Sequence, residues 1–326
     1  MPCTVRMNTS LHVWLLALVM TYPPRTAYQS MQQRTWLRRC WFTNHSQWRH
    51  VFVQGVLSGR KPLAHDVLVN DTLTLGGLVE SYSSLATKTM LALRWAHAHA
   101  SFEFLLKTDD DTVVHVTHLW AWVDAQDRQE RLRLYAGQWV HERAQVLVQG
   151  MSGTVRPQHQ ITHVAMATLH LKATYPPYAN GLGYVLGRSA VAAIAAEMSD
   201  AVLAIGTKQS MPEDALIGVL AHRAGLCPRR FESGVTCRQP PRAPRNGLFH
   251  GHVISLPAMS SQVHRGANQQ GGASRDPAER VFADLLRTTC RGRSPAACVS
   301  RGEQSVWNAR KGRKAQKRSL CAWNRC

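Results

Sequence analysis

Three consecutive carboxylates end a short apolar run in the middle of the chain. The segment FEFLLKTDDDT (102–112) delivers Asp109, Asp110 and Asp111 from residues typical of a buried strand. Such close like charges repel one another, and a divalent cation that prefers hard oxygen ligands, Mn²⁺ or Mg²⁺, relieves the repulsion. In an extended segment Asp109 and Asp111 point the same way. The alternative is a solvated acidic turn, but α/β sheets bind ligands at the carboxyl ends of strands, which favours the metal.

A segment rich in Gly and Tyr, TYPPYANGLGYVLG (174–187), is the second candidate. Gly181 and Gly183 permit a close approach of the backbone or a positive φ. Three tyrosines offer flat surfaces with polar tips that suit stacking on a sugar or a base: Tyr175, Tyr178 and Tyr184. An ordinary Pro-rich turn before a strand has the same pattern, so this segment alone leaves both roles open.

A third candidate is MPEDALIGVL (211–220), which has the pattern of a helix start. Pro212 suits the first helical position, and Gly225 suits the end of the helix. Glu213 and Asp214 then fall in the first turn, where the helix dipole and the free N–H groups stabilise ionised carboxylates. Helix capping is the common role of such residues, so a catalytic role needs support from elsewhere.

Short apolar runs and helical stretches alternate along the chain, which predicts an α/β sheet with parallel pairs. The expected strands are Val13–Met20, Val51–Leu57, Asp66–Val69, Phe102–Lys107 and Leu132–Ala136. The expected helices are Thr87–Ala100, a stretch capped by Ser189 that runs to Met198, and a short one at Val281–Arg287.

The composition is that of a basic globular protein. Of 326 residues, 44% are apolar, which excludes a disordered chain, and 39 Lys+Arg against 20 Asp+Glu give a formal charge of +19. The segment Arg301–Cys326 carries eight Lys/Arg and one Glu, or 8 − 1 = +7. The excess fits nucleic acid, a nucleotide-sugar substrate or a solvated tail. No zinc-finger pattern or RNA-recognition motif supports nucleic acid.

The N-terminal run LHVWLLALVM (11–20) is shorter than the roughly 20 residues that span a membrane. It resembles a signal-peptide core, but Pro23 and Pro24 follow in place of a small-residue cleavage site, so we expect a buried strand that ends at a Pro-Pro turn. The eight cysteines form no CxxC pair, and both a few disulfides and a reduced set fit their spacing.

Taken together, the motifs resemble those of the β1,3-glycosyltransferases of family 31, including protozoan relatives. The strand and Arg-rich helix ending in Thr-Trp correspond to Leu15–Trp36, and the family segment DxYxNLTxKTxxGLxW corresponds to Glu80–Trp95. KTDDDT, YPPYANGLGYVLG and PEDALIG follow in the family's order. The resemblance covers roughly Leu11 to His252, and five motifs in order are far more specific than any one.

This resemblance implies a GT-A fold, a nucleotide-binding α/β sandwich with a mixed, mainly parallel central sheet flanked by helices. It assigns Asp111 as the direct ligand of a Mn²⁺ or Mg²⁺ ion, with Asp109 beside it, and Asp214 as the catalytic base. A later histidine, His250 or His252, is a metal-ligand candidate, and either is equally well a surface residue. Substrate binding falls to Asp109, Asp110, Lys88, Tyr178, Gly181, Gly183 and Glu213.

The implied reaction moves galactose or an N-acetylhexosamine from a UDP-sugar to a hydroxyl of a glycan acceptor, with inversion to a β1,3 linkage, in the Golgi. The chain departs from the family at Gln33, where an Arg is expected, and at Ser84, where an Asn is expected. The family's usual membrane anchor is not visible before the expected first strand, and we therefore expect either an incomplete reading of a longer protein or an unanchored copy. We expect a remnant at 1–10, a catalytic domain at 11–258 and a loop-rich extension with a basic tail at 259–326.

Two other functions compete with the transferase. One is a catalytically degenerate copy that keeps the fold and binds a sugar or nucleotide without turnover, which Gln33 favours and the intact DDD and ED motifs oppose. The other is a nucleic-acid-binding protein, which rests on the positive charge alone.

Overall fold

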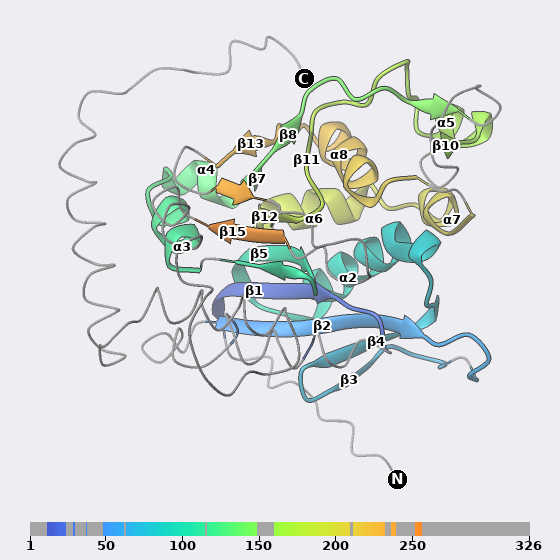
Figure 1. The fold of residues 1–326 in the computed structure, drawn as a ribbon, viewed down its shortest axis with the longest axis horizontal. Helices are drawn as coiled ribbons and strands as arrows, with labels where there is room; N and C mark the ends of the chain where they lie inside the picture. Colours follow the sequence, from blue (N-terminus) through green and yellow to red (C-terminus); the bar gives the residue numbers. More distant parts are fainter. Residues whose placement is uncertain are drawn as a thin grey trace, which may run out of the picture. The chain divides into compact units, whose positions relative to one another are not determined.

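The computed structural model describes residues 12–23, 29, 37, 48–61, 63–114, 116–148, 160–208, 211–231, 236–238 and 252–255. The chain forms two compact units, and each is described by itself. The first unit comprises residues 1–29, 45–110 and 127–231, and the second comprises residues 30–44, 111–126 and 232–326. The first unit contains the large sheet and all of its covering helices that are named below (Figure 1).

An eight-stranded mixed sheet organises the first unit, in the order β13-β7-β12-β5-β1-β2-β4-β3. Strands β4, β2, β1 and β5 are parallel neighbours, while β12 runs antiparallel to both β5 and β7. The strands are β1 Val13–Met20, β2 Trp48–Val56, β3 Val67–Val69, β4 Thr72–Val79, β5 Phe102–Asp109, β7 Tyr135–Gly137, β12 Gly183–Gly187 and β13 Arg229–Arg230. This arrangement confirms a mixed, mainly parallel sheet.

Strand β1 lies between β5 and β2 in the interior of the sheet, and all eight of its residues, VWLLALVM, are buried. A strand covered on both faces is apolar at every position rather than at alternate ones. Its register pairs Met20 with Val53 of β2 and with Asp109 of β5, so β1 and β5 end together, while β2 continues to Val56 at the same edge of the sheet. The chain then leaves through Thr21, whose N–H donates to the Val53 carbonyl at 2.9 Å.

Four helices of the first unit form a layer in which α2 and α6 pack against the sheet, while α7 and α8 pack on α2 (Figure 1). They are α2 Leu85–His99, α6 Arg188–Ala196, α7 Asp200–Lys208 and α8 Glu213–Arg223. Helix α8 is buried along most of its length, and Gly218 lets it approach the Tyr178 side chain closely, since a Cβ there would collide with that residue. It ends at Gly225, whose φ of +68° suits a residue without a side chain.

Smaller elements complete the first unit. They are the 3₁₀ turn η2 Tyr82–Ser84, helices α4 Arg128–Leu132 and α5 His163–Thr168, and short strands β8 Val140–His141, β9 Leu147–Val148, β10 Gln160–Ile161 and β11 Tyr178–Ala179. In the second unit, β6 Thr112–Val113 is joined by β15 His252–Ser255 and β14 Thr236–Arg238 in a three-stranded sheet, and α3 spans Val116–Asp124.

Most of the expected elements are present in the described residues, several with shifted ends: β2 begins at Trp48, α2 begins at Leu85, and Pro212 is the N-cap of α8 rather than its first residue. Three further differences matter for the interpretation. The run expected as a strand at Leu132–Ala136 is divided between α4 and β7. Helix α6 begins at Arg188 with Gly187 as N-cap, not at Ser189, because β12 leads directly into it. Strand β5 ends at Asp109, and the next two aspartates form a turn, so strand alternation does not set the directions of their side chains.

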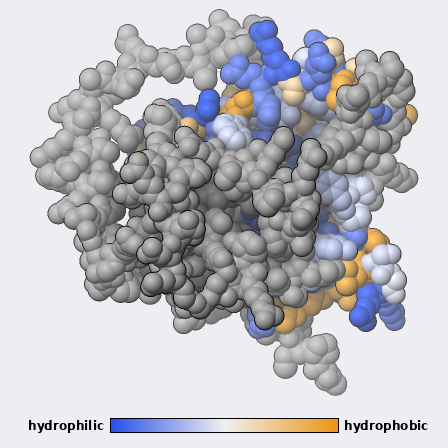
Figure 2. Space-filling view, viewed as in Figure 1, coloured by the Kyte–Doolittle hydropathy of each residue, from blue (hydrophilic) through white to orange (hydrophobic). Residues whose placement is uncertain are grey.

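The Val281–Arg287 helix, the extension and the basic tail lie outside the described residues. No single described helix has the length and hydropathy to cross a membrane, and α6 with α7 reaches both only as a pair bent by 97°. The described surface mixes polar and apolar residues, with orange atoms over β3 at the lower right (Figure 2). Exposed Val69 on β3 and Val79 on β4 are among its large apolar residues.

Candidate active site

The polar side chains of the first unit gather at the edge where β1, β2 and β5 end. Because β12 is antiparallel to β5, it begins at that same edge, with Gly183 paired to Thr108. Helix α8 also begins there, since its first residue, Glu213, contacts the Lys107 side chain on β5. The carboxyl ends of parallel strands are the usual place for ligands in α/β proteins.

Lys107 is the centre of this group. Its side chain has no exposed surface, and its Nζ donates to Asp109 Oδ1 at 2.8 Å, to the Gly181 carbonyl at 2.8 Å and to Glu213 Oε2 at 3.0 Å. An ammonium has three donors, so Lys107 uses all of them. Lys107 and Asp109 lie two apart on β5, which places both side chains on one face of the strand.

Glu213 turns inward from the first turn of α8. Its other oxygen, Oε1, accepts a hydrogen bond from the Tyr184 hydroxyl at 2.7 Å. Tyr184 faces Lys107 across the β5–β12 pair, and the Lys107 Nζ lies 5.7 Å from the centre of its ring. Because Tyr184 is fully buried, the expected stacking of this ring on a ligand is wrong.

Burial and charge act in opposite directions within this network. Burial alone lowers the pKa of Lys107, but the carboxylates of Asp109 and Glu213 outweigh it and the pKa of Lys107 is raised. Burial raises the pKa of Glu213, and the charges of Asp214 and Asp109 add to this, against the opposing effect of Lys107. Burial, followed by the charge of Glu213, raises the pKa of Tyr184, so its hydroxyl keeps its proton and donates a hydrogen bond to Glu213. The ammonium of Lys107 thus has two carboxylate partners, those of Asp109 and Glu213.

Asp214 lies next to this network and is only half-buried. Its Oδ2 accepts the Gly181 N–H and its Oδ1 accepts the Ala215 N–H, both at 2.9 Å. Both backbone groups of Gly181 are therefore hydrogen-bonded: its N–H donates to Asp214, and its carbonyl accepts from Lys107. A Cβ at Gly181 would lie 3.2 Å from Glu213 Oε2 and 3.4 Å from Asp214 Oδ2, so its role is close approach rather than positive φ.

Aromatic residues border the carboxylate of Asp214. The ring of Tyr178 stacks on His141 with centroids 4.8 Å apart and meets Tyr175 edge-on at 6.1 Å. Burial, and then the charge of Asp214, raise the pKa of Tyr175 to about 12, and the same two causes raise that of Tyr178. Among the described residues, the Tyr175 hydroxyl is buried without a hydrogen-bond partner.

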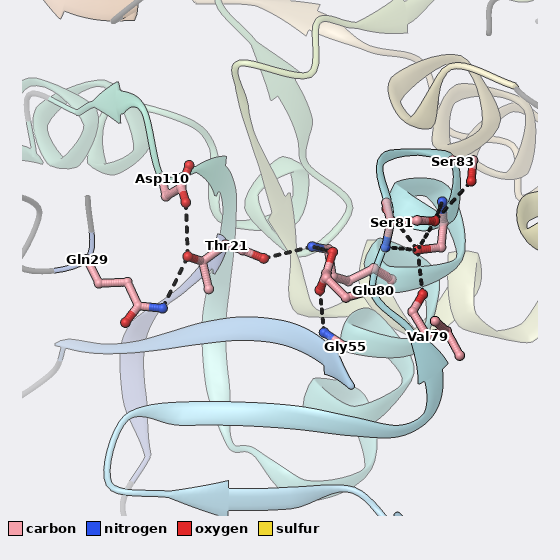
Figure 3. Close-up of polar contacts among 10 residues, drawn as sticks. Thr21, Gln29, Gly55, Val79, Glu80, Ser81, Ser83 and Asp110 are labelled. Atoms are coloured by element: carbon pink, nitrogen blue, oxygen red, sulfur yellow. Dashed lines mark hydrogen bonds and ion pairs between the residues drawn. The ribbon is translucent and has the colours of Figure 1, made fainter. Parts of the chain in front are cut away.

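A second buried lysine lies at the same edge, in the network that Figure 3 draws. Lys88 on α2 donates to Glu80 Oε1 at 2.7 Å and to the Thr21 carbonyl at 2.8 Å. Glu80 also accepts the Gly55 N–H, and the Thr21 hydroxyl donates to Asp110 Oδ2 at 2.9 Å. This network joins the end of β1 to the start of α2, and it holds Asp110, which is 3% exposed.

The sequence-predicted residues are thus distributed over both units. Asp109, Asp110, Gly181, Gly183, Glu213, Asp214, Tyr178 and Lys88 all belong to the first unit. Asp111 belongs to the second unit, where the backbone of His252 on β15 pairs with Thr112, the residue after Asp111. His250 and Gln33 lie outside the described residues. Substrate and metal roles for these residues stay predictions.

The residues present offer oxygen ligands of the kind that a divalent cation prefers. No three His, Cys, Asp or Glu side chains within the described ranges form a group that could hold a metal by themselves. Mg²⁺ is commonly bound through one or two carboxylates together with substrate phosphates. Asp109 fits that arrangement. Its Oδ1 pairs with Lys107, and its side chain is still 30% exposed, so its second carboxylate oxygen could bind an ion.

Sequence analysis assigned no role to Lys107, Glu80 or Thr21. Lys107 had a recognisable cue, since a lysine in an otherwise apolar strand two residues before Asp109 must find a buried anion. Glu80 and Thr21 had no such cue, because their partners lie in segments far away along the chain.

The first unit is therefore an α/β domain with an acidic site at the carboxyl edge of its sheet. Residues 32–232 match the model of the galactosyltransferase family, and this chain belongs to that family. It is 29% identical over 248 residues to the human protein named beta-1,3-galactosyltransferase 4, and 30% identical over 254 residues to its dog counterpart; each alignment covers 66% of this chain and 62% of the relative. It is also 26% identical over 220 residues to human N-acetyllactosaminide beta-1,3-N-acetylglucosaminyltransferase 4, covering 66% of this chain and 53% of that protein. The chain thus spans less than two thirds of the length of these relatives.

Proposed function

We propose that this protein is an inverting hexosyltransferase of the GT-A type that moves galactose or an N-acetylhexosamine from a UDP-sugar to a glycan hydroxyl, forming a β1,3 linkage. Family membership supports glycosyl transfer, since its relatives carry the names of β1,3-galactosyl- and N-acetylglucosaminyltransferases. The observation that carries the proposal is the pairing of Asp214 with Gly181 at the edge where Asp109 ends β5. Residence in the Golgi is part of the same proposal.

Asp214 is the proposed base. Two backbone N–H groups hold its carboxylate in one orientation. The ionised oxygen accepts the proton of the acceptor hydroxyl as that hydroxyl attacks the anomeric carbon of the donor, and UDP leaves from the opposite side. A single displacement converts an α-linked donor into a β-linked product.

Asp109, with Asp111 following in the sequence, would hold a Mn²⁺ or Mg²⁺ ion together with the donor phosphates. When bound, such an ion neutralises the charge that develops on the departing diphosphate. Lys107 keeps one oxygen of Asp109 engaged, so the carboxylate has a fixed orientation toward the donor.

The test is release of free UDP from a panel of UDP-sugars with Mn²⁺ and a glycan acceptor. Asp214→Asn is expected to retain nucleotide binding and to lose turnover by at least about 100-fold, the usual contribution of a general base. Asp200→Asn is the matched control, because Asp200 also begins a helix but is exposed. Turnover that survives Asp214→Asn removes this residue as the base, and nucleotide binding without any turnover identifies a degenerate copy.

A further inference from the structure

The Lys107 side chain joins the strand that ends at Asp109 to the helix that begins with Glu213 and Asp214. We infer that Lys107 is a positioning residue that sets the geometry of Asp214 through the Gly181 residue, and that of Asp109 directly. The inference deepens the proposed transferase function and rests on it. The three hydrogen bonds of the Lys107 ammonium go to Asp109, Gly181 and Glu213 rather than to Asp214, so its effect on Asp214 passes through Gly181.

The contacts of Gly181 carry the first step. Its carbonyl accepts from Lys107 Nζ at 2.8 Å and its N–H donates to Asp214 Oδ2 at 2.9 Å. A residue held at both groups has little freedom to rotate. Loss of the ammonium would free the carbonyl, and the N–H that orients Asp214 would move with it.

The contacts of the carboxylates carry the second step. Asp109 and Glu213 both bond to the same ammonium, and without it two negative charges would face each other across the β5–α8 contact. The resulting repulsion would separate the strand end from the helix start. Lys107 is fully buried, and water cannot replace it without a rearrangement of the neighbouring side chains.

The principal test compares Lys107→Met with Thr108→Val. Thr108 is the next residue on β5, and its hydroxyl donates to the next carbonyl of the same turn, that of Leu182, at 3.0 Å. Each variant therefore removes one side-chain hydrogen bond to a carbonyl of the 181–182 segment. Only Lys107→Met removes the bond to Gly181 and the ion pair with Asp109. Lys107→Met is expected to lower kcat by about 100-fold, as for a small misplacement of a reacting group, and Thr108→Val is expected to leave kcat near the wild-type value.

The donor KM separates positioning from a purely structural role. In Lys107→Met the donor KM is expected to rise along with the fall in kcat, because Asp109 loses its partner. A structural role alone would lower the folded fraction and leave the donor KM of the folded protein unchanged.

A second pair of variants serves if Lys107→Met does not fold. Glu213→Met/Tyr184→Phe keeps Lys107 on Asp109 and Gly181, while the triple variant with Lys107→Met removes the whole buried group and leaves no isolated charge on Glu213. Replacement of a complete buried ion pair by apolar residues is commonly tolerated. The inference predicts a much lower kcat for the triple variant than for the double variant, and equal kcat values would overturn it.

Amide hydrogen exchange of the segment 178–183 does not depend on turnover. Faster exchange in Lys107→Met than in Thr108→Val supports positioning of the Gly181 residue, even if the wild-type protein transfers no sugar and the proposed function fails. Equal exchange in the two variants, or wild-type kcat and KM in folded Lys107→Met, would overturn the inference.

Discussion

The two buried lysines at the carboxyl edge of the sheet differ in the number of carboxylates that surround them. Lys88 has one carboxylate partner, Glu80, and one carbonyl partner, so this ion pair is neutral. Lys107 has two carboxylate partners and one carbonyl partner, and the same Gly181 residue also binds the carboxylate of Asp214. Lys88 therefore meets one carboxylate directly, while Lys107 meets two.

This difference suggests different tasks for the same residue type. A neutral buried pair has no remaining need for a counter-ion, so the Lys88 network mainly joins β1 to α2. The excess negative charge around Lys107 suits a site that binds a cation or accepts a proton. The comparison yields predictions about stability that are independent of the identity of the sugar.

The largest expected difference is between Glu80→Gln and Glu213→Gln. Glu80→Gln leaves Lys88 without an anion and places an amide N–H₂ against either Lys88 or the Gly55 N–H, so we expect a loss of about 3 kcal/mol in the free energy of unfolding. Glu213→Gln leaves Lys107 paired with Asp109, and the Tyr184 hydroxyl can reverse to accept from the amide, so we expect a loss of about 1 kcal/mol.

Urea unfolding followed by circular dichroism measures both values. Equal losses in the two variants would mean that Asp109 does not compensate Lys107 for the loss of the Glu213 carboxylate. The two lysine networks would then not differ in their contribution to the free energy of unfolding. The slope of the urea transition should stay unchanged, since neither variant alters the surface exposed on unfolding.

Tyr184→Phe is expected to have an intermediate effect. It removes the hydroxyl that donates to Glu213 Oε1, and a buried hydrogen bond to a charged group contributes about 2 kcal/mol. In the Glu213→Gln background the same change should cost less, because the acceptor is no longer charged. A double-mutant cycle in urea measures this coupling, and additive losses would show that Tyr184 does not stabilise the ionised form of Glu213.

Sequence patterns predicted the parts of this site that depend on local order. The run VWLLALVM followed by a Pro-Pro turn predicted β1 with its observed bounds, because an apolar run of eight bounded by breakers is typical of a strand buried on both faces. Asp214 in the first turn of α8 followed equally from local rules, since Pro212 and the two acidic residues are typical of a helix start.

The contacts between distant segments could not be predicted in this way. Lys107 meets Glu213 because β12 inserts between β5 and β7, and that strand order depends on packing of the whole sheet. The turn at Asp110 and Asp111 was only the less favoured alternative from the sequence, because local pattern does not show where the strand, and with it the alternation of side chains, ends.

The smallest expected effect concerns His50 on β2, which belongs to neither lysine network. Burial lowers the pKa of His50 below its ordinary value of 6.5, although the hydrogen bond to Asp71 at 3.1 Å opposes this. Because the unfolded chain binds the proton first, His50 contributes stability above 6.5 that is lost as the pH falls from there toward its pKa in the folded protein. His50→Gln should therefore show a shallower fall in the free energy of unfolding over this acid range than the wild-type protein. Parallel curves would assign the pH dependence to other groups, and the lysine variants would then have to be compared at a single neutral pH.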